Sequence, residues 1–306
     1  MRVLITGATG TIGLATADAL RARGDQVVAL SRDPDRGQRV LGEGVEVHGW
    51  AEPTSAPPPS EALAGADAVI HLLGEPVAQR WSEEAKGKIR DSRVLPTRQL
   101  VGALSQLSDS ERPKVLVSQS ATGYYGPRGD APLDEDAAAG QDFLAEVVVA
   151  WEQEASAAAS LMRVATTRTG VVLSPSAGAL AKMLPAFKLG VGGPVAGGRQ
   201  YVSWIHLDDV VGALLCCADQ AEASGPVNVT APNAVTNAEL SRALGHALGR
   251  PAVLPVPGFA VKLLYGEMAE MVTTGQRVVP ARLRALGYEF RHPEVEPALR
   301  DVLSAS

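Results

Sequence analysis

The chain has 306 residues, of which 46% are hydrophobic and 20% charged, and its formal net charge is −6. That length can bury a sizeable core, and the acidic balance argues against a sequence-independent nucleic-acid surface. The only cysteines, Cys216 and Cys217, are adjacent, so we expect a buried helix face over residues 211–218 and no disulfide framework. No apolar run is long enough to span a membrane. Because the first predicted strand begins at Arg2, we expect no signal peptide and a cytoplasmic location.

The first half of the chain alternates short apolar strands with helical patterns. Such alternation predicts βαβ units and a parallel sheet. Residue 96 is a proline within the second helical pattern, and a kink or break is expected there. The predicted strands cover residues 2–6, 26–31, 45–49, 67–73, 114–118 and 163–168, and the predicted helices cover residues 11–23, 82–104 and 143–160.

After Thr169 the pattern changes. Residues 185–200 are rich in glycine and predict a loop or ribbon, whereas Thr236 and Glu239 have the spacing of a capping box and predict a helix start. Proline-punctuated helices follow from about Arg250. We therefore expect an α/β protein with a doubly wound parallel sheet of the Rossmann type, built from residues 1–173 and 203–230. A smaller C-terminal α/β substrate lobe would comprise residues 174–202 and 231–306.

Glycines lie between the first predicted strand and the first predicted helix. Gly7 allows a tight turn, Gly10 lets the backbone approach a pyrophosphate, and Gly13 permits close packing of the helix on the strand. Backbone N–H groups and the positive end of the helix would bind the phosphates. The predicted cofactor-binding residues of this loop are Gly7, Thr9, Gly10, Thr11, Ile12 and Gly13.

The end of the second strand indicates which dinucleotide binds. An NAD site places a carboxylate there for the adenosine ribose. Here the strand ends in Ser31 and Arg32, and the first acid, Asp33, comes two residues late. A hydroxyl and a guanidinium suit a 2′-phosphate, with Arg36 as a second cation. The sequence therefore predicts NADP(H) rather than NAD(H).

The third and fourth predicted strands each end in a residue that has two possible roles. Trp50 would either flank the adenine or belong to the core. We expect His71 to be packed inside the protein or to act as a cap, rather than to be catalytic. Gly74 would let the cofactor approach the sheet edge. The remaining predicted cofactor-binding residues are Leu72, Gly74, Arg93 and Ser118.

The chain resembles the extended short-chain dehydrogenase/reductase superfamily, and more closely its poorly characterised branch of epimerase-like proteins. The resemblance implies an NADP-binding Rossmann core and a small C-terminal substrate lobe, without a settled substrate. It covers nearly the whole chain and rests on residues 7–13, 31–32, 74–76, 92–93, 118–126, 198–200, 203–206 and 275–278.

One departure from the superfamily concerns the chemistry. Its enzymes carry Tyr-x-x-x-Lys on the helix after the fifth strand, where the tyrosine transfers a proton and the lysine assists it. If Glu152 is the later glutamate of that helix, Leu144 and Val148 occupy the two positions. Neither side chain can move a proton, so the standard mechanism is not available.

The loop after the fifth strand offers substitutes. The resemblance aligns Ser120 with the catalytic serine of the superfamily, and Tyr124 and Tyr125 are the nearest phenols. Strand-end bonding for the serine and packing for the tyrosines are the structural alternatives. Arg93 would supply a charge for the phenol, contact a phosphate or lie at the surface. Farther along the chain, Arg199 would grip a diphosphate or brace its loop. His206 is expected to be structural, with Asp208 or Asp209 as the helix N-cap.

Two functions remain open from the sequence. The first is an NADP(H)-dependent oxidoreductase or epimerase-like enzyme that acts on a small carbonyl or sugar-nucleotide-like substrate. The alternative is a non-catalytic NADP(H)-binding redox sensor or scaffold. The absence of both residues of the Tyr-x-x-x-Lys pair leaves this alternative open. No nucleic-acid or membrane partner is expected in either case.

Overall fold

The structure is a computed structural model that describes residues 1–304. Most helices and strands of the first half lie where the sequence pattern predicts them. The elements of this half are β1 (Arg2–Thr6), α1 (Thr11–Ala22), β2 (Gln26–Ser31), α2 (Pro34–Leu41), β3 (Val45–Gly49), α3 (Ser60–Leu63), β4 (Ala68–His71), α4 (Glu83–Gln106), β5 (Val115–Ala121), the 3-10 turn η1 (Thr122–Tyr125), β6 (Pro132–Leu133) and α5 (Phe143–Ser156).

The second half completes the sheet and builds the lobe. Its elements are η2 (Ala157–Ser160), β7 (Arg163–Thr169), β8 (Val171–Leu173), α6 (Gly178–Lys188), β9 (Tyr201–Val202), β10 (Trp204–His206), α7 (Leu207–Asp219), β11 (Gly225–Val229), β12 (Val235–Thr236), α8 (Asn237–Leu248), α9 (Gly258–Tyr265), η3 (Gly266–Ala269), α10 (Glu270–Thr273), β13 (Arg277–Val278), α11 (Ala281–Ala285) and α12 (Val295–Ser304).

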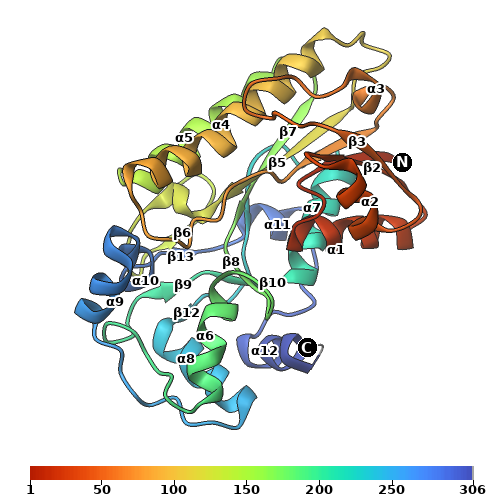
Figure 1. The fold of residues 1–306 in the computed structure, drawn as a ribbon. Coiled ribbons are helices and arrows are strands. Elements are labelled where there is room, and N and C mark those ends of the chain that lie inside the picture. Colours follow the sequence, from red (N-terminus) through yellow and green to blue (C-terminus); the bar gives the residue numbers. More distant parts are fainter. Residues whose placement is uncertain (305–306) are drawn as a thin grey trace.

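Seven parallel strands form the main sheet in the order β11-β7-β5-β4-β1-β2-β3. The strand order reverses between β1 and β4, and in such sheets ligands bind outside the carboxyl ends of the strands at this point. Helices cover both faces of the sheet (Figure 1). The predicted Rossmann-type α/β fold is therefore confirmed.

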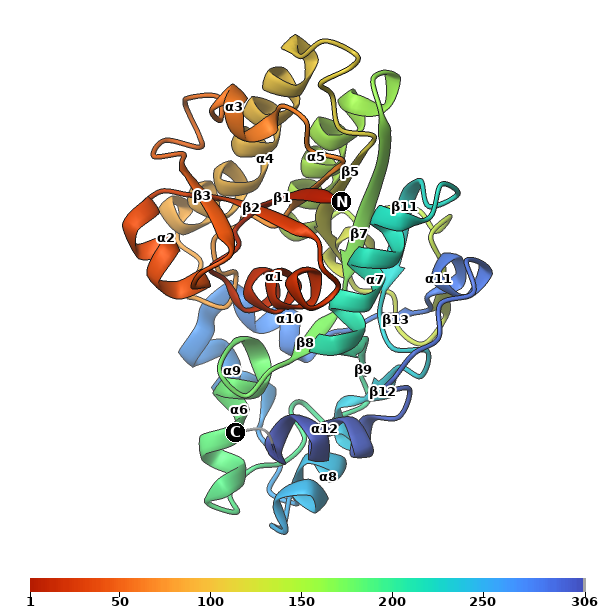
Figure 2. The same ribbon diagram turned by 90° about the vertical axis from the view of Figure 1, so that its right-hand side faces the viewer.

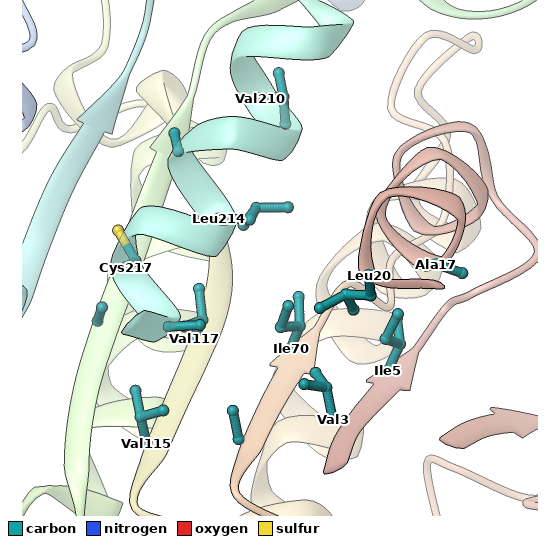
Figure 3. Close-up of a cluster of buried hydrophobic side chains, with 14 of the residues drawn as sticks. Val3, Ile5, Ala17, Leu20, Ile70, Val115, Val117, Val210, Leu214 and Cys217 are labelled. Carbon is teal, nitrogen blue, oxygen red and sulfur yellow. The ribbon is translucent and has the colours of Figure 1, made fainter. Parts of the chain in front are cut away.

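Two apolar clusters fix these layers, one on each face of the sheet. On one face, Val115 and Val117 of β5 pack in the same cluster as Leu20 of α1 and Leu214 of α7 (Figure 3). On the other face, Leu116 packs with α4 and α5. Successive strand residues point to opposite faces, so a continuous apolar run such as residues 115–117 suits a strand covered on both sides.

A third apolar cluster lies below the sheet, between α6, α8 and α12 (Figure 2). It contains the fully buried Trp204 of β10 and Leu299 of α12. Around it lie short two-stranded pairings, β8 with β10 and β9 with β12, while β13 pairs with β6. The lobe is thus assembled from several separated segments of the chain.

Two prolines lie inside helices where the sequence predicts a break or a loop. Helix α4 runs through Pro96 without a break. Pro96 is buried, and its packing against neighbouring elements outweighs the loss of one hydrogen bond. The expected loop from residue 185 is also too long, because α6 contains Pro185 and continues to Lys188. The buried side chains of Leu184 and Phe187 hold this last turn against the lobe core.

The helix and strand ends show one confirmation and two corrections. Thr236 and Glu239 form the predicted capping box of α8. The N-cap of α7 is His206, whose Nδ1 accepts from the N–H of Asp208 at 3.1 Å, and neither aspartate takes that place. Asp209 instead accepts backbone N–H groups from residues 291 and 292 at 2.8 and 2.9 Å. Strand β5 extends three residues beyond the prediction, which places Ser120 inside the strand.

The buried helix face predicted over residues 211–218 belongs to α7. Cys217 is buried, Cys216 is half-buried, and both thiols are free. Burial raises the pKa of Cys217 to about 12, so this thiol is not reactive at neutral pH. Within residues 1–304, every helix is too short or too polar to cross a bilayer.

Candidate functional site

The glycine loop between β1 and α1 has no room for side chains at two of its glycines. A Cβ atom on Gly13 would lie 2.3 Å from the carbonyl oxygen of Gly7, and one on Gly7, whose φ is +70°, would lie 2.8 Å from the carbonyl oxygen of Leu72. Gly10 is the N-cap of α1, without a side-chain cap or an acid in the first turn. Helix N–H groups are thus left for an external anion, and the residues present fit a dinucleotide pyrophosphate. Thr9, Thr11 and Ile12 complete this loop.

The tip of β2 carries an exposed, unpaired cation. Arg32 makes no ion pair with any other residue of the described chain, and Arg36 is likewise exposed. Asp33 is occupied, because its carboxylate caps α2 by accepting from the N–H of Arg36 at 3.0 Å. Ser31 donates its hydroxyl to the carbonyl oxygen of Asp33 at 2.7 Å and so shapes the turn. A 2′-phosphate would meet Arg32 here, and the nearest carboxylate, that of Asp33, is held as the cap of α2.

A buried polar chain lies behind the end of β4. The Nδ1 of His71 is 2.7 Å from the hydroxyl of Thr6, and its Nε2 is 3.0 Å from the hydroxyl of Thr97. Trp151 donates to the same Thr97 hydroxyl at 3.0 Å. Burial lowers the pKa of His71 to about 3, so the ring is neutral. The expectation that His71 is packed is confirmed. Trp50 likewise belongs to the core, since its side chain is buried.

Arg93 is tied to backbone carbonyls next to the sheet edge. It donates to the carbonyl oxygens of Ile89 and Glu75, both at 2.9 Å, and its guanidinium lies over the Trp151 ring, 5.4 Å from the centroid. A Cβ on Gly74 would lie 3.1 Å from this guanidinium. Burial lowers the pKa of Arg93 to about 10. Arg93 therefore braces the segment after β4, and Gly74 leaves it room.

The two serines of β5 point into the protein. Ser118 is fully buried. The hydroxyl of Ser120 donates to Oε1 of Glu152 at 2.6 Å. Glu152 also binds the guanidinium of Arg168 through both carboxylate oxygens, at 2.8 and 2.9 Å. The proton of Ser120 is therefore directed toward α5 and not toward a substrate carbonyl.

Arg168 is nearly fully buried, and all of its polar edges are engaged. Besides Glu152, it donates to the hydroxyl of Tyr125 at 3.0 Å and to the carbonyl oxygen of Glu135 at 3.2 Å. Burial alone would lower the pKa of Arg168, but hydrogen bonds and the charge of Glu152 raise it, so the side chain stays charged. Sequence reasoning missed this residue. The signal was available, because a charged side chain within a buried strand requires a partner.

The two tyrosines of η1 differ in what they contact. Tyr125 is fully buried, and its hydroxyl donates to Asn228 at 2.6 Å while it accepts from Arg168. Burial raises its pKa to about 12. Tyr124 is half-buried, and the face of its ring lies 3.4 Å from the Arg168 guanidinium. Among the described residues, none forms a hydrogen bond with the Tyr124 hydroxyl.

Helix α5 meets η1 at the positions where the superfamily carries Tyr and Lys. A Cβ on Gly123 would lie 3.5 Å from Cβ of Leu144 and 3.9 Å from Cγ2 of Val148. The lobe approaches the same turn, since Gln276 donates to the carbonyl oxygen of Thr122 at 3.1 Å. The turn η1, which contains Tyr124, thus contacts both an apolar helix face and the lobe. Arg199 lies outside this cluster, exposed in the loop before β9.

His206, His292 and Asp301 bring potential metal-ligand atoms within 4.8 Å of one another. The two rings are stacked, with centroids 3.7 Å apart and planes inclined by 23°. Lone pairs of imidazole lie in the ring plane, so stacked rings do not both point at one ion. The N-cap bond to Nδ1 of His206 also leaves the proton of the neutral ring on Nε2. This cluster suits a helix cap better than a metal, in line with the structural role expected for His206.

Comparisons with known proteins identify related families and structures. Residues 3–230 match the model of the NAD dependent epimerase/dehydratase family, and residues 256–302 match a domain of unknown function, DUF1731. The epimerase family protein MT2273 of Mycobacterium tuberculosis is 42% identical over 97% of this chain and 96% of its own. The chloroplastic SDR39U1 homologue of Arabidopsis thaliana is 39% identical over 99% of this chain and 87% of its own.

A solved structure is similar over the full length of both chains. The structure of human epimerase family protein SDR39U1 with NADPH superimposes with a TM-score of 0.89 at 35% sequence identity, and it covers 100% of each chain. A structure of MoeE5 with UDP-glucose and NAD, at 22% identity and a TM-score of 0.78, shares the fold. The chain therefore belongs to the NAD dependent epimerase/dehydratase family, among its SDR39U1-type epimerase family proteins.

Proposed function

We propose that the protein binds NADPH and reduces a small carbonyl-containing substrate, with Tyr124 as the proton donor. The observation that carries the cofactor choice is the exposed, unpaired Arg32 at the tip of β2, where an NAD site would present a carboxylate. The human relative solved with NADPH supports the same choice. When bound, NADPH would supply a hydride, and every other requirement falls on side chains of this chain.

The glycine loop would hold the pyrophosphate through backbone N–H groups of residues 11–13 at the start of α1, because the N–H of Gly10 already donates to the carbonyl oxygen of Gly7 at 3.0 Å. Arg32 would contact the 2′-phosphate, with Arg36 as a second cation. Leu72 and Gly74 would form the sheet edge beneath the cofactor. Arg93 and Ser118 would act indirectly, since both side chains are engaged within the protein.

Proton donation would come from Tyr124, because its hydroxyl has no partner among the described residues and its ring is fixed on Arg168. The burial of Tyr125 argues against it as the donor. Ser120 would act as a positioning residue, since its proton goes to Glu152, which anchors Arg168. No lysine lies on α5 to stabilise a phenolate, so we expect Tyr124 to donate a proton rather than to accept one. Reduction should therefore be faster than the reverse oxidation.

Cofactor specificity is tested by isothermal titration with NADPH and NADH. Loss of a charge-assisted phosphate contact costs about 1.5–3 kcal/mol, so Arg32→Ala should weaken NADPH binding about tenfold or more and leave NADH nearly unchanged. Arg39→Ala is the matched control, since Arg39 is an exposed arginine in the last turn of α2. Equal losses for both cofactors in Arg32→Ala would show that this arginine does not bind the 2′-phosphate.

A second candidate function is an NADP(H)-binding redox sensor without turnover. The observation that favours it is the apolar pair Leu144 and Val148, which provides neither proton donor nor cation at the usual place. Incubation of NADPH with a panel of aldehydes, ketones and sugar nucleotides separates the two functions. Loss of NADPH absorbance that Tyr124→Phe abolishes supports the reductase, whereas tight binding without oxidation across the panel supports the sensor.

The compartment in which this reaction would occur is a separate proposal. A cytoplasmic location remains our prediction, whereas the relative in Arabidopsis thaliana is named as a chloroplastic protein. Microscopy of the tagged full chain in its native cell tests it.

A further inference from the structure

Two histidine rings join helix α12, and the segment before it, to α7. His206 is the N-cap of α7, and its side chain is nearly fully buried. His292 lies in the segment between α11 and α12, and its ring stacks on that of His206 with the centroids 3.7 Å apart. Oδ2 of Asp301, in α12, lies 3.2 Å from Nε2 of His206. The two rings therefore lie where three separate parts of the chain meet.

The cap of α7 fixes which nitrogen of His206 carries the proton. Nδ1 accepts from the N–H of Asp208 at 3.1 Å, so the proton of the neutral ring is on Nε2. This Nε2 is buried and lies within ion-pair distance of the Asp301 carboxylate without forming a hydrogen bond. A second proton on His206 can go only to Nδ1, the atom that accepts from the helix. The helix cap and the charged ring therefore exclude each other.

Two carboxylates near the rings would favour a positive charge, but both are open to water. Asp208 lies 3.5 Å from Nε2 of His292 and 3.9 Å from Nδ1 of His206. The side chains of Asp208 and Asp301 are 50% and 54% exposed, so solvent weakens their attraction for a charged ring. Burial, and then the neighbouring His292 ring, lower the pKa of His206 by more than the carboxylates raise it. The folded protein therefore favours the neutral ring.

The segment before α12 has a second anchor on α7 that does not involve the rings. Asp209 is fully buried and accepts the backbone N–H groups of residues 291 and 292 at 2.8 and 2.9 Å, as well as the Tyr288 hydroxyl at 3.0 Å. The Arg291 side chain is exposed and forms no ion pair within residues 1–304. Because these bonds hold residues 288–292 in place, α12 is the part that can move away from His206.

Helix α12 also contacts a histidine of α8. Glu296 of α12 accepts from Arg300 of the same helix at 2.5 Å and lies 3.5 Å from Nδ1 of the exposed His246. A proton on His246 would strengthen this contact, whereas a second proton on His206 breaks the cap of α7. The two histidines that α12 contacts should therefore respond to acid in opposite directions.

We propose that His206 and His292 form an acid-sensitive latch, which holds α12 against α7 at neutral pH and releases it in acid. Below the ordinary histidine pKa of 6.5, an opened form with His206 in water binds a proton that the closed form rejects, so docking of α12 weakens as the pH falls. Release would uncover Ala298 and Leu299, and with them the core shared with α6 and α8. Such a latch would operate whether or not the protein is a reductase.

Hydrogen exchange of the full chain, followed by mass spectrometry and corrected for the intrinsic effect of pH, tests the latch. Between about pH 7.5 and about pH 5.5, protection of residues 295–304 should fall by about three- to tenfold, since one histidine contributes at most about tenfold per pH unit. His206→Asn should abolish this fall, because asparagine also caps a helix but does not titrate. His292→Phe should reduce the fall, because it keeps an aromatic ring on His206 and removes the second charge.

His246→Gln is the matched control, since it removes the other histidine next to α12 and should leave the fall at least as large as in the wild type. Thermal unfolding at neutral pH establishes that each variant is folded. Equal protection of α12 at both pH values in the wild type would overturn the proposal. So would a full fall in His206→Asn or, if that variant does not fold, in His292→Phe. Loss of the fall in His246→Gln, or an equal fall in the strands of the main sheet, would also contradict it.

Discussion

The carboxyl edge of the sheet has two ends that are built on different principles. At β1 and β2 the groups available to a ligand are backbone N–H groups and the exposed Arg32 and Arg36, and two glycines have no room for a side chain. At β5 and α5 the groups are side chains, and nearly all of them are already bonded to one another around Arg168. Binding at the first end depends on local backbone geometry, whereas chemistry at the second end depends on a network drawn from distant segments. The two ends can therefore diverge independently.

The largest expected effect comes from opening the network at the second end. Glu152→Ala would leave the guanidinium of Arg168 buried without its carboxylate, which typically costs about 3–5 kcal/mol of folding free energy. Urea denaturation measures this loss. The matched control is Glu154→Ala, because Glu154 pairs with the exposed Arg98 and such pairs contribute about 1 kcal/mol or less. Equal losses for both variants would mean that the network does not hold this end together.

The first end should respond to a single added methyl group. Gly13→Ala places a Cβ 2.3 Å from the carbonyl oxygen of Gly7, so the loop must shift, at a cost of about 1–3 kcal/mol. NADPH affinity, measured by titration, should fall at least about tenfold. Gly102→Ala is the control, because nothing lies within 4 Å of a Cβ there and alanine favours a helix interior by about 0.5–1 kcal/mol. Unchanged NADPH binding in Gly13→Ala would contradict the phosphate-binding role of the loop.

The two adjacent tyrosines provide the same contrast within one turn. Tyr125→Phe removes a hydroxyl bonded to Arg168 and Asn228, so it should lower the folding free energy by about 1–2 kcal/mol. Tyr124→Phe removes a hydroxyl that no described residue bonds, so stability should change by about 0.5 kcal/mol or less. Once a substrate is known, kcat should fall more in Tyr124→Phe than in Tyr125→Phe, the opposite of the order expected for stability. If Tyr124→Phe retains full kcat, the proton donor lies elsewhere.

His71 lies between the two ends and gives the smallest expected effect near neutral pH, and this effect grows as the pH falls. Its pKa is about 3 in the folded protein, against 6.5 ordinarily, so below pH 6.5 the unfolded chain binds a proton that the native ring rejects. Stability should therefore fall as the pH falls from 6.5 toward 3. The fall should be at most about 1.4 kcal/mol per pH unit from this group. Urea denaturation at several pH values should show a flatter dependence for His71→Gln, while the exposed His246→Gln should behave like the wild type.

The same contrast explains how far the sequence could predict this structure. The strands of the sheet follow from short apolar runs such as residues 115–117, and the capping box of α8 follows from two side chains three residues apart. Both are local signals. The Arg168 network joins Glu135, Glu152 and Asn228, which are far apart in the chain, and nothing local indicates which of them meet. The break predicted at Pro96 is absent for a related reason, because tertiary packing rather than local sequence decides that α4 continues through this residue.

The position of α12 has a consequence for how the chain folds during synthesis. This last helix, Val295–Ser304, contributes the fully buried Ala298 and Leu299 to the core shared with α6 and α8. Until it has left the ribosome, α6 and α8 present an open apolar surface, and most of the main sheet is already complete by then. Between the release of β11 and the release of α12, the nascent chain thus has a complete sheet and an unfinished lobe, the state most open to chaperones and aggregation.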